Sequence, residues 1–97
     1  MGKWYEKFLN ERERLKDNFV LSFHCVVDKM SPLNLNARDV QEIVMTGKVV
    51  QDKCEKPNKI AFARYYGKEL NTTYVVVTRF NPNNIKVVTL WAVKGRL

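Results

Sequence analysis

The sequence predicts an α+β fold, with helices in the first half of the chain and an antiparallel sheet in the second. Apolar residues recur at helical spacing before residue 47, whereas runs rich in Val, Thr, Tyr and Phe, separated by short turn sequences, follow it. The length of 97 residues suits one hydrophobic core. We therefore expect a single domain over residues 1–97, with a helical part over 3–47 and a sheet over 48–94.

The helical part begins with an amphipathic segment. In residues 3–17, the side chains of Trp4, Phe8 and Leu15 recur on one face, while charged residues occupy the other. This spacing predicts a helix, and the aromatic stripe is more typical of core packing than of a ligand site.

The next segment fits two structures. Residues 19–23 fit a short strand, but Ser22 is also a good N-cap for a helical turn that runs to Met30 and ends before Pro32. We favour the helix. A further helix is expected over residues 37–45, capped by Asn34 or Asn36 and ended by Gly47.

Four strand-like runs follow, joined by turn sequences of hairpin length. The expected strands cover residues 48–54, 59–66, 72–80 and 85–93, and the turns cover 55–58, 67–69 and 81–84. Short turns favour a four-stranded antiparallel sheet with the helices on one face and the other face exposed. Because side chains alternate along a strand, Arg64 and Tyr65 must lie on opposite faces, but the sequence leaves open which face is exposed.

The charge of the chain is concentrated at one end. Residues 48–97 carry ten basic and three acidic groups, whereas residues 1–19 carry five and four, and residues 20–47 carry two and three. A lopsided basic surface attracts polyanions. The expected partner is therefore RNA or another polyanion, although an acidic protein or an anionic membrane surface would satisfy the same charge.

Several kinds of chemistry find no support in the sequence. There is no glycine-rich phosphate loop, and one histidine with two cysteines that lack CxxC spacing makes an incomplete zinc set. We expect no metal and no cofactor, and free thiols at Cys25 and Cys54. The apolar runs are far shorter than a membrane span and the first residues are not signal-like, so we expect a cytoplasmic protein without a membrane partner.

The strand half contains the residue types that hold single-stranded nucleic acid, namely cations for phosphates and aromatic rings for bases. The candidate binding residues are Lys48, Tyr65, Tyr74, Arg79, Lys86, Trp91 and Lys94. The structural alternative is that aromatic residues simply suit a sheet, and that strand lysines protect its edges.

Spaced motifs add a resemblance. The first motif is Ser22-x-His24 at the opening of a helix, followed by Met30 and by Asp39-Val40 in a helix that ends at Gly47 to Val50. The later motifs are Ala63-Arg64 at the end of one strand, Tyr74 to Val77 at the start of the next, and Val87 to Trp91 in the last. This order resembles a family of small uncharacterised domains grouped with the RelE and BrnT toxins of toxin-antitoxin systems.

That resemblance implies a RelE/barnase-like nuclease fold and RNA cleavage without a metal. It also implies His24, Arg64 and Thr89 as catalytic residues, Trp91 in place of a usual tyrosine, and an acidic antitoxin-like protein as a possible partner. Two departures are Lys29-Met30, one residue farther from the histidine than usual, and Lys68-Glu69, where the family has Arg-Pro.

Two hypotheses follow from the sequence. The first is a metal-independent endoribonuclease of the toxin type, and the alternative is a non-catalytic module that binds nucleic acid or protein on the same scaffold. A third possibility is a structural protein that forms a homodimer through an edge strand of its sheet.

Overall fold

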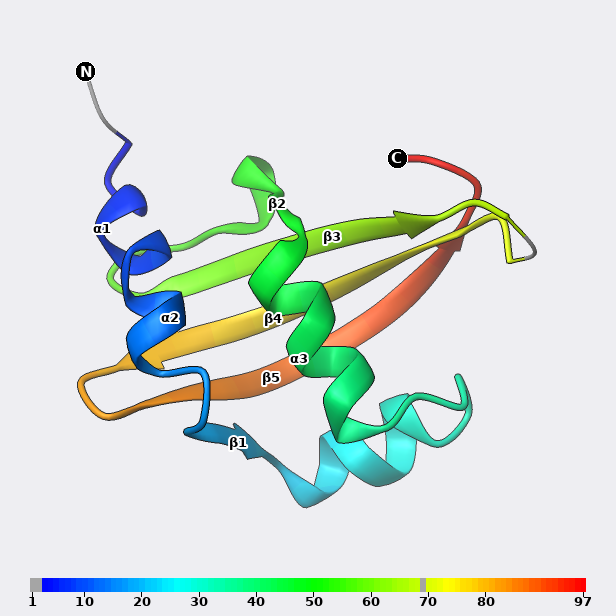
Figure 1. Ribbon diagram of the computed structural model, residues 1–97, viewed down its shortest axis with the longest axis horizontal. Helices are drawn as coiled ribbons and strands as arrows, with labels where there is room; N and C mark the ends of the chain where they lie inside the picture. Colours follow the sequence, from blue (N-terminus) through cyan, green and yellow to red (C-terminus); the bar gives the residue numbers. More distant parts are fainter. Residues whose placement is uncertain (1–2, 69) are drawn as a thin grey trace.

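The computed structural model describes residues 3–68 and 70–97, and its fold is α+β, with one five-stranded mixed sheet (Figure 1). The strands are β1 (Phe19–Leu21), β2 (Lys48–Val49), β3 (Lys59–Tyr66), β4 (Thr72–Asn81) and β5 (Asn84–Lys94). Their order across the sheet is β1-β5-β4-β3-β2. β1 runs parallel to β5, and all other neighbours are antiparallel.

The three long strands lie close to where the sequence places them. β3 spans the predicted residues, β4 is one residue longer at its end, and β5 is one residue longer at each end. The turn over residues 81–84 becomes a tight hairpin in which Asn81 pairs with Asn84. Of the predicted turn over residues 67–69, Glu69 lies outside the described residues, as do Met1 and Gly2 of the predicted domain.

The fifth strand corrects the prediction of a four-stranded antiparallel sheet. Phe19–Leu21 forms β1, and only the following residues are helical, as the π-helix η1 (Cys25–Met30). The Ser22 hydroxyl accepts a hydrogen bond from the backbone N–H of Cys25 at 3.1 Å, as expected of an N-cap residue. The strand forms because β5 offers an otherwise unpaired edge, a tertiary partner that local propensity does not reveal.

The predicted N-terminal helix is interrupted. It consists of two single turns, α1 (Glu6–Leu9) and α2 (Glu11–Arg14), separated by Asn10. Asparagine is a poor residue in a helix interior, so the interruption falls where propensity is weakest. The aromatic stripe packs into the core as predicted, with the ring centroids of Phe8 and Phe80 5.7 Å apart.

The helix predicted over residues 37–45 is α3 (Ala37–Thr46). A capping box starts it: Asp39 N–H donates to Asn36 Oδ1 at 2.8 Å, and Asn36 N–H donates to Asp39 Oδ2 at 3.0 Å. At its other end, Arg12 of α2 donates to the carbonyl oxygen of Val44 at 3.0 Å. This bond satisfies one of the carbonyl groups that a helix C-terminus leaves free.

The strand predicted over residues 48–54 is much shorter than expected. β2 ends at Val49, and Gln51–Lys53 forms a short 3₁₀ turn, η2. The backbone N–H of Ala61 on β3 meets the Cys54 sulfur at 3.5 Å instead of a strand carbonyl group. The chain therefore leaves the sheet after Val49. The last residues of β3 have no partner strand on that side among the described residues for a different reason: β2 is antiparallel and begins only at Lys48, opposite Ala63, because α3 occupies the residues before it.

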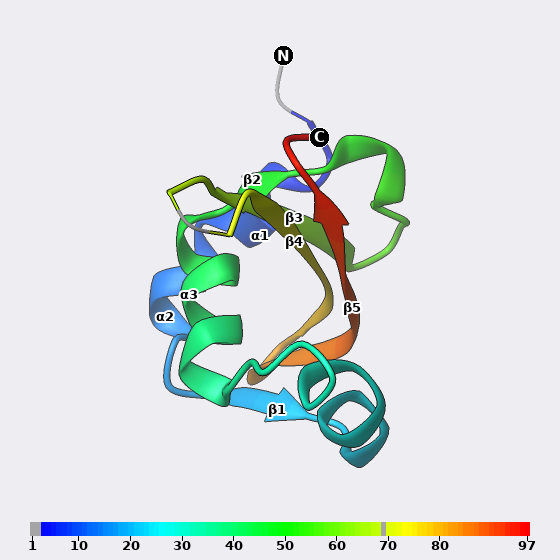
Figure 2. The ribbon, with the colours of Figure 1, turned by 90° about the vertical axis from the view of Figure 1, so that its right-hand side faces the viewer.

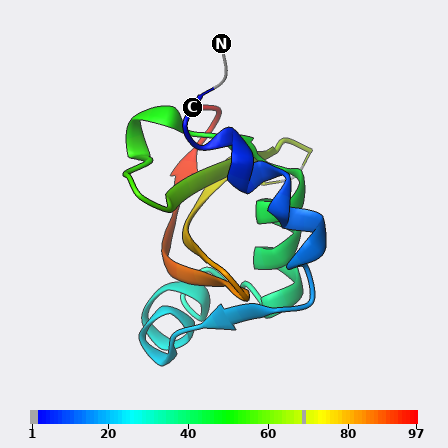
Figure 3. The same ribbon diagram turned by 90° about the vertical axis from the view of Figure 1, so that its left-hand side faces the viewer.

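The helices α2 and α3 lie against one face of the curved sheet, as the two side views show (Figures 2 and 3). The core lies between them, formed by buried side chains of α3 and by alternate residues of the strands. These include Val40, Ile43, Val44, Ile60, Phe62, Val76, Phe80, Ile85, Val87 and Leu90. In the described part of the chain, no helix is long and apolar enough to cross a membrane.

Candidate nucleic-acid interface

The face of the sheet opposite α3, which we call the outer face, gathers most of the predicted site residues. Strand alternation and the pairing register place the following on it: Lys48, Tyr65, Arg79, Lys86, Thr89 and Trp91. Tyr65 therefore lies on the outer face and Arg64 on the other, which resolves the choice that the sequence left open.

Three cations form a row across one end of the outer face. Arg79 of β4 pairs directly with Lys59 of β3 on one side and with Lys86 of β5 on the other. Neighbouring strands are about 4.8 Å apart, so the row spans roughly 10 Å. Lys59 Nζ lies 3.2 Å from Glu55, whereas Arg79 reaches only the neutral side chain of Asn58, at 3.4 Å. We call these three residues the cation row.

The middle of the outer face carries small or apolar side chains. Ala61, Val75 and Val77 are buried, and Trp91, opposite Val75 in the register, is half-buried. These buried side chains are short, so the solvent-accessible surface of this region is formed by the longer side chains around them. Trp91 is therefore the aromatic plane of this region, between the cation row and the far end of β3.

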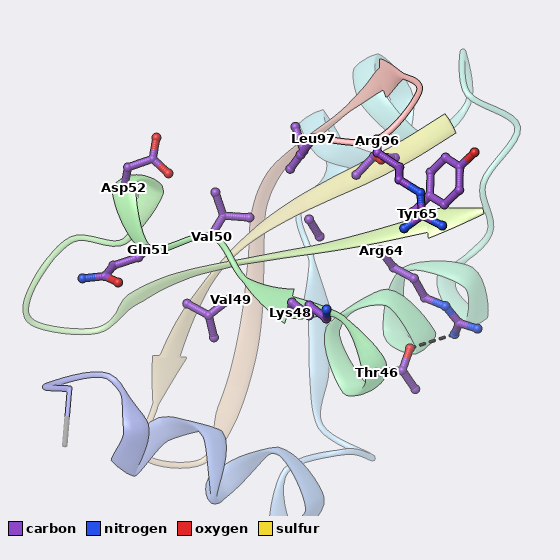
Figure 4. Close-up of a pocket in the computed structure, with 12 residues that line it drawn as sticks. Thr46, Lys48, Val49, Val50, Gln51, Asp52, Arg64, Tyr65, Arg96 and Leu97 are labelled. Carbon is purple, nitrogen blue, oxygen red and sulfur yellow. Dashed lines mark hydrogen bonds between the residues drawn. The ribbon is translucent and has the colours of Figure 1, made fainter. Parts of the chain in front are cut away.

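At that far end, a cleft of 510 Å³ opens beside the short strand β2 (Figure 4). Its lining contains three cations, Lys48, Arg64 and Arg96, against one carboxylate, Asp52. The polar side chains of Thr46, Gln51, Tyr65 and Thr73 complete much of the wall. Tyr65 is the sixth residue after Lys59 along β3, so the cleft lies about 20 Å from the cation row.

The C-terminal segment is tied down beside Tyr65. Thr73 Oγ1 donates to the carbonyl oxygen of Gly95 at 2.7 Å, and the Gly95 N–H donates to the carbonyl oxygen of Asn71 at 2.7 Å. These bonds place the Arg96 guanidinium carbon 4.3 Å from the centroid of the Tyr65 ring. The Tyr65 hydroxyl in turn donates to Asn71 Oδ1 at 2.6 Å, so the ring that carries Arg96 is itself held at both ends.

Arg64 reaches the cleft from the other face of the sheet. Its Nη1 donates to Thr46 Oγ1 at 2.7 Å and lies 3.5 Å from Glu42 Oε2, while its guanidinium carbon lies 4.9 Å from the Tyr66 ring. The Tyr66 hydroxyl donates to the same Glu42 oxygen at 2.8 Å. Burial, and after it this bond to Glu42, raises the pKa of Tyr66 to about 12.

The backbone adds a donor at the same place. The Val50 N–H donates to the carbonyl oxygen of Ala61, and the Phe80 N–H donates to the carbonyl oxygen of Asn58. The backbone N–H and C=O groups of odd-numbered residues in β3 therefore point towards β2, and those of even-numbered residues point towards β4. By this alternation the N–H of Tyr65 points past the start of β2, which pairs Lys48 with Ala63. An anion in the cleft would meet this N–H as well as the cations.

Besides Arg64, three predicted residues lie off the outer face. Tyr74 is buried in the core, where it packs edge to face against Tyr66, so its ring is not available to a base. Lys94 is exposed at the end of β5, paired with Thr72, on the side of α3 by alternation. His24 precedes η1 at the β1 edge, and its Nδ1 lies 2.7 Å from Asp28 Oδ2.

The three predicted catalytic residues do not converge. Two strands separate β1, which precedes His24, from β3, which carries Arg64, so these elements are roughly 14 Å apart. Thr89 lies on the outer face and Arg64 on the opposite one. A general acid or base must come within about 3 Å of the atom it serves, directly or through one water.

The sequence analysis missed two cations of the interface. Lys59 stands at the start of a predicted strand, and only its pairing with Arg79 shows that it extends a row. Arg96 follows the last predicted strand, and its position over Tyr65 depends on the bonds that hold Gly95. The alternation of side chains along β3 could be predicted from the sequence, but the pairing of β3 with its neighbouring strands could not.

Comparisons with protein-family models, curated proteins and solved structures gave no match. Within residues 3–68 and 70–97, no three His, Cys, Asp or Glu side chains gather as a metal site would require.

Proposed function

We propose that the protein binds single-stranded RNA on the outer face of its sheet, without cleaving it. Phosphates would lie along the cation row and in the basic cleft, and bases would stack on Trp91 between them. A strand that crosses the roughly 20 Å between the two regions needs about three or four nucleotides, within the range of a single-domain site. The cytoplasm is the proposed location.

The observation that carries the proposal is the cation row. Like charges directly opposite each other destabilise a sheet, so three in register call for an explanation beyond folding. Lysines that protect an edge do not provide it, because β4 and β5 both lie inside the sheet. A polyanion that binds across the three strands would neutralise the row.

The resemblance to RelE and BrnT toxins supports RNA as the polyanion, and membership of that superfamily remains part of the proposal. Toxin-type cleavage is the weaker candidate, because His24, Arg64 and Thr89 lie on different elements and faces. An acidic antitoxin-like protein would suit the same cations, but the half-buried Trp91 on the same face, between the two basic regions, favours a ligand with bases.

The test is fluorescence anisotropy with a labelled mixed-sequence RNA of about twelve nucleotides, a length within the usual range for one domain. EDTA is present, and the RNA is afterwards run on a gel. We expect salt-sensitive binding by the wild type, weaker binding by Arg79→Gln and Trp91→Ala, and intact RNA. Arg38→Gln is the matched control, since Arg38 is an exposed arginine on α3, away from the outer face.

Equal losses in Arg38→Gln and Arg79→Gln would show that only net charge matters and would remove the assignment to the outer face. Equal affinity for RNA and for polyglutamate would exclude base stacking and favour an acidic protein. Defined products on the gel, lost in His24→Ala, would instead establish a ribonuclease.

A further inference from the structure

The β1 edge of the sheet is unpaired in the described chain. β1 is the last strand in the order β1-β5-β4-β3-β2, and it has a neighbour only on the β5 side. An edge strand with free backbone groups is a template for another strand.

The register of β1 identifies which groups are free. The Ile85 N–H donates to the carbonyl oxygen of Asn18, and Phe19 pairs with Ile85 in a parallel ladder. In that pattern, both backbone groups of Val20 bond to β5, while those of Phe19 and Leu21 point away from the sheet. Two residues, separated by one, therefore present both a donor and an acceptor at the edge.

Exposed apolar side chains lie on the same stretch of chain. Val20, Phe23 and Val27 are 42%, 83% and 44% exposed, and we call them the edge patch. The described chain has only two other large apolar side chains that are as exposed, Leu70 and Leu97. A phenylalanine that is 83% exposed adds nothing to the core of its own chain.

The net charge around β1 indicates which partner could pair with this edge. Residues 20–47 carry a net charge of −1, from two basic and three acidic groups, whereas residues 48–97 carry +7, from ten and three. Two copies that met through their basic halves would repel each other, but two copies that met at β1 would not. Another copy also brings a strand whose free groups repeat the same pattern.

We infer that the protein forms a twofold homodimer by antiparallel pairing of β1 with β1 of a second copy, centred on Val20. Phe19 of each copy then exchanges two hydrogen bonds with Leu21 of the other, which uses all the free groups. Val20 stands opposite Val20 of the second copy on the outer face, about 4.5 Å away between Cα atoms. On the opposite face, Phe19 stands opposite Leu21, which continues the apolar core across the axis.

The dimer would join the two cation rows. Val20 pairs with Lys86, so the row of each copy ends beside the twofold axis. The two Lys86 residues would be three strand spacings apart, about 14 Å, which exceeds the Debye length of roughly 10 Å at 0.1 M salt, so their repulsion is weak. This consequence rests on the proposed function, whereas the dimer itself does not.

The experiment is sedimentation velocity over a wide range of protein concentration, without RNA. We expect a concentration-dependent species of twice the 11.4 kDa chain mass for the wild type, and a monomer for Val20→Lys, which sets two lysines opposite each other at the axis. The matched control is Leu70→Lys, an equally drastic change at a side chain that is 51% exposed in the turn before β4, which should dimerise like the wild type.

Amide hydrogen exchange gives a second readout that a general loss of solubility would not mimic. As the concentration rises, the N–H groups of Phe19 and Leu21 should become protected, while that of Val20 is protected in monomer and dimer alike. A wild type that stays monomeric at millimolar concentration would overturn the inference, and so would a dimer that persists in Val20→Lys. RNA binding by a monomeric wild type would remove the dimer only, whereas a dimer without RNA binding would remove the proposed function only.

Discussion

Removal of two members of the cation row should change the salt dependence of RNA binding by a calculable amount. Five cations face the outer surface or its cleft: Lys48, Lys59, Arg79, Lys86 and Arg96. Arg64, which reaches the cleft from the opposite face, is engaged with Thr46 and Glu42 and is not counted. If each contacts one phosphate of a single strand, the slope of log K against log salt is about −3.5, since each contact contributes about −0.7. The Arg79→Ala, Lys86→Ala double variant should give about −2.1.

These slopes predict a clear difference in affinity. Between about 50 and 200 mM salt, the affinity of the wild type should fall about 130-fold and that of the double variant about 20-fold. The assay is a salt titration followed by fluorescence anisotropy, with the same labelled RNA for both proteins. Thermal unfolding should show no loss of stability in the double variant, because it removes like charges that stand opposite each other.

The control is a double variant of exposed cations on the helices, Lys7→Ala with Arg38→Ala, which changes the net charge equally. Its slope should match that of the wild type. If the two double variants gave the same slope, binding would follow net charge alone and the interface would not be the outer face.

Three further predictions concern the fold around the site. The pKa of Tyr66 is raised from 10.0 to about 12 in the folded protein, so Tyr66 contributes stability that is complete below pH 10 and is lost as the pH rises towards 12. In an ultraviolet titration, the Tyr66→Phe variant should lack the late-titrating phenol. The free energy of unfolding of this variant should also fall less than that of the wild type between about pH 10 and pH 12. Gly47→Ala should cost about 1–3 kcal/mol, because a Cβ there would lie 2.4 and 2.8 Å from two backbone carbonyl oxygens. Gly67→Ala should cost less, because its Cβ would meet only the side chain of Tyr65, which can shift if its hydrogen bond to Asn71 lengthens, and chemical denaturation should separate the two variants. Asn36→Ala, which breaks the capping box of α3, should cost about 1 kcal/mol and lower the melting temperature by about 4–8 °C, and no change would show that water replaces the cap.

Much of the local structure was predictable because its signals are short-range. The capping residues of α3 lie within four residues of each other, and the turn between β4 and β5 is built from asparagine and proline that favour it locally. The alternation of Val, Thr and Tyr along β3 and β4 needed no partner to be read. These elements appear in the structure within a residue of their predicted bounds.

The candidate site was predictable in its residue types and only partly in its positions. Lys48, Tyr65, Arg79, Lys86 and Trp91 were expected to bind nucleic acid, and the structure brings them to one face. Tyr74 was expected there too, but it differs from Tyr65 only in which side of its strand it occupies. The sequence does not reveal which face α3 covers, so alternation alone could not tell which of the two tyrosines is exposed.

The sequence by itself therefore determined the α+β class, the three long strands, the capped helix α3 and the basic character of the second half. Only the tertiary structure decided that Phe19–Leu21 is a strand, that the sheet is mixed, and which face carries Tyr65 rather than Arg64. It also decided that Lys59, Arg79 and Lys86 stand side by side. The physical reason is range: periodicity and turn chemistry act over a few residues, whereas the partner of a strand and the cover of a face are set by residues far apart in the chain, as Phe19 and Ile85 are.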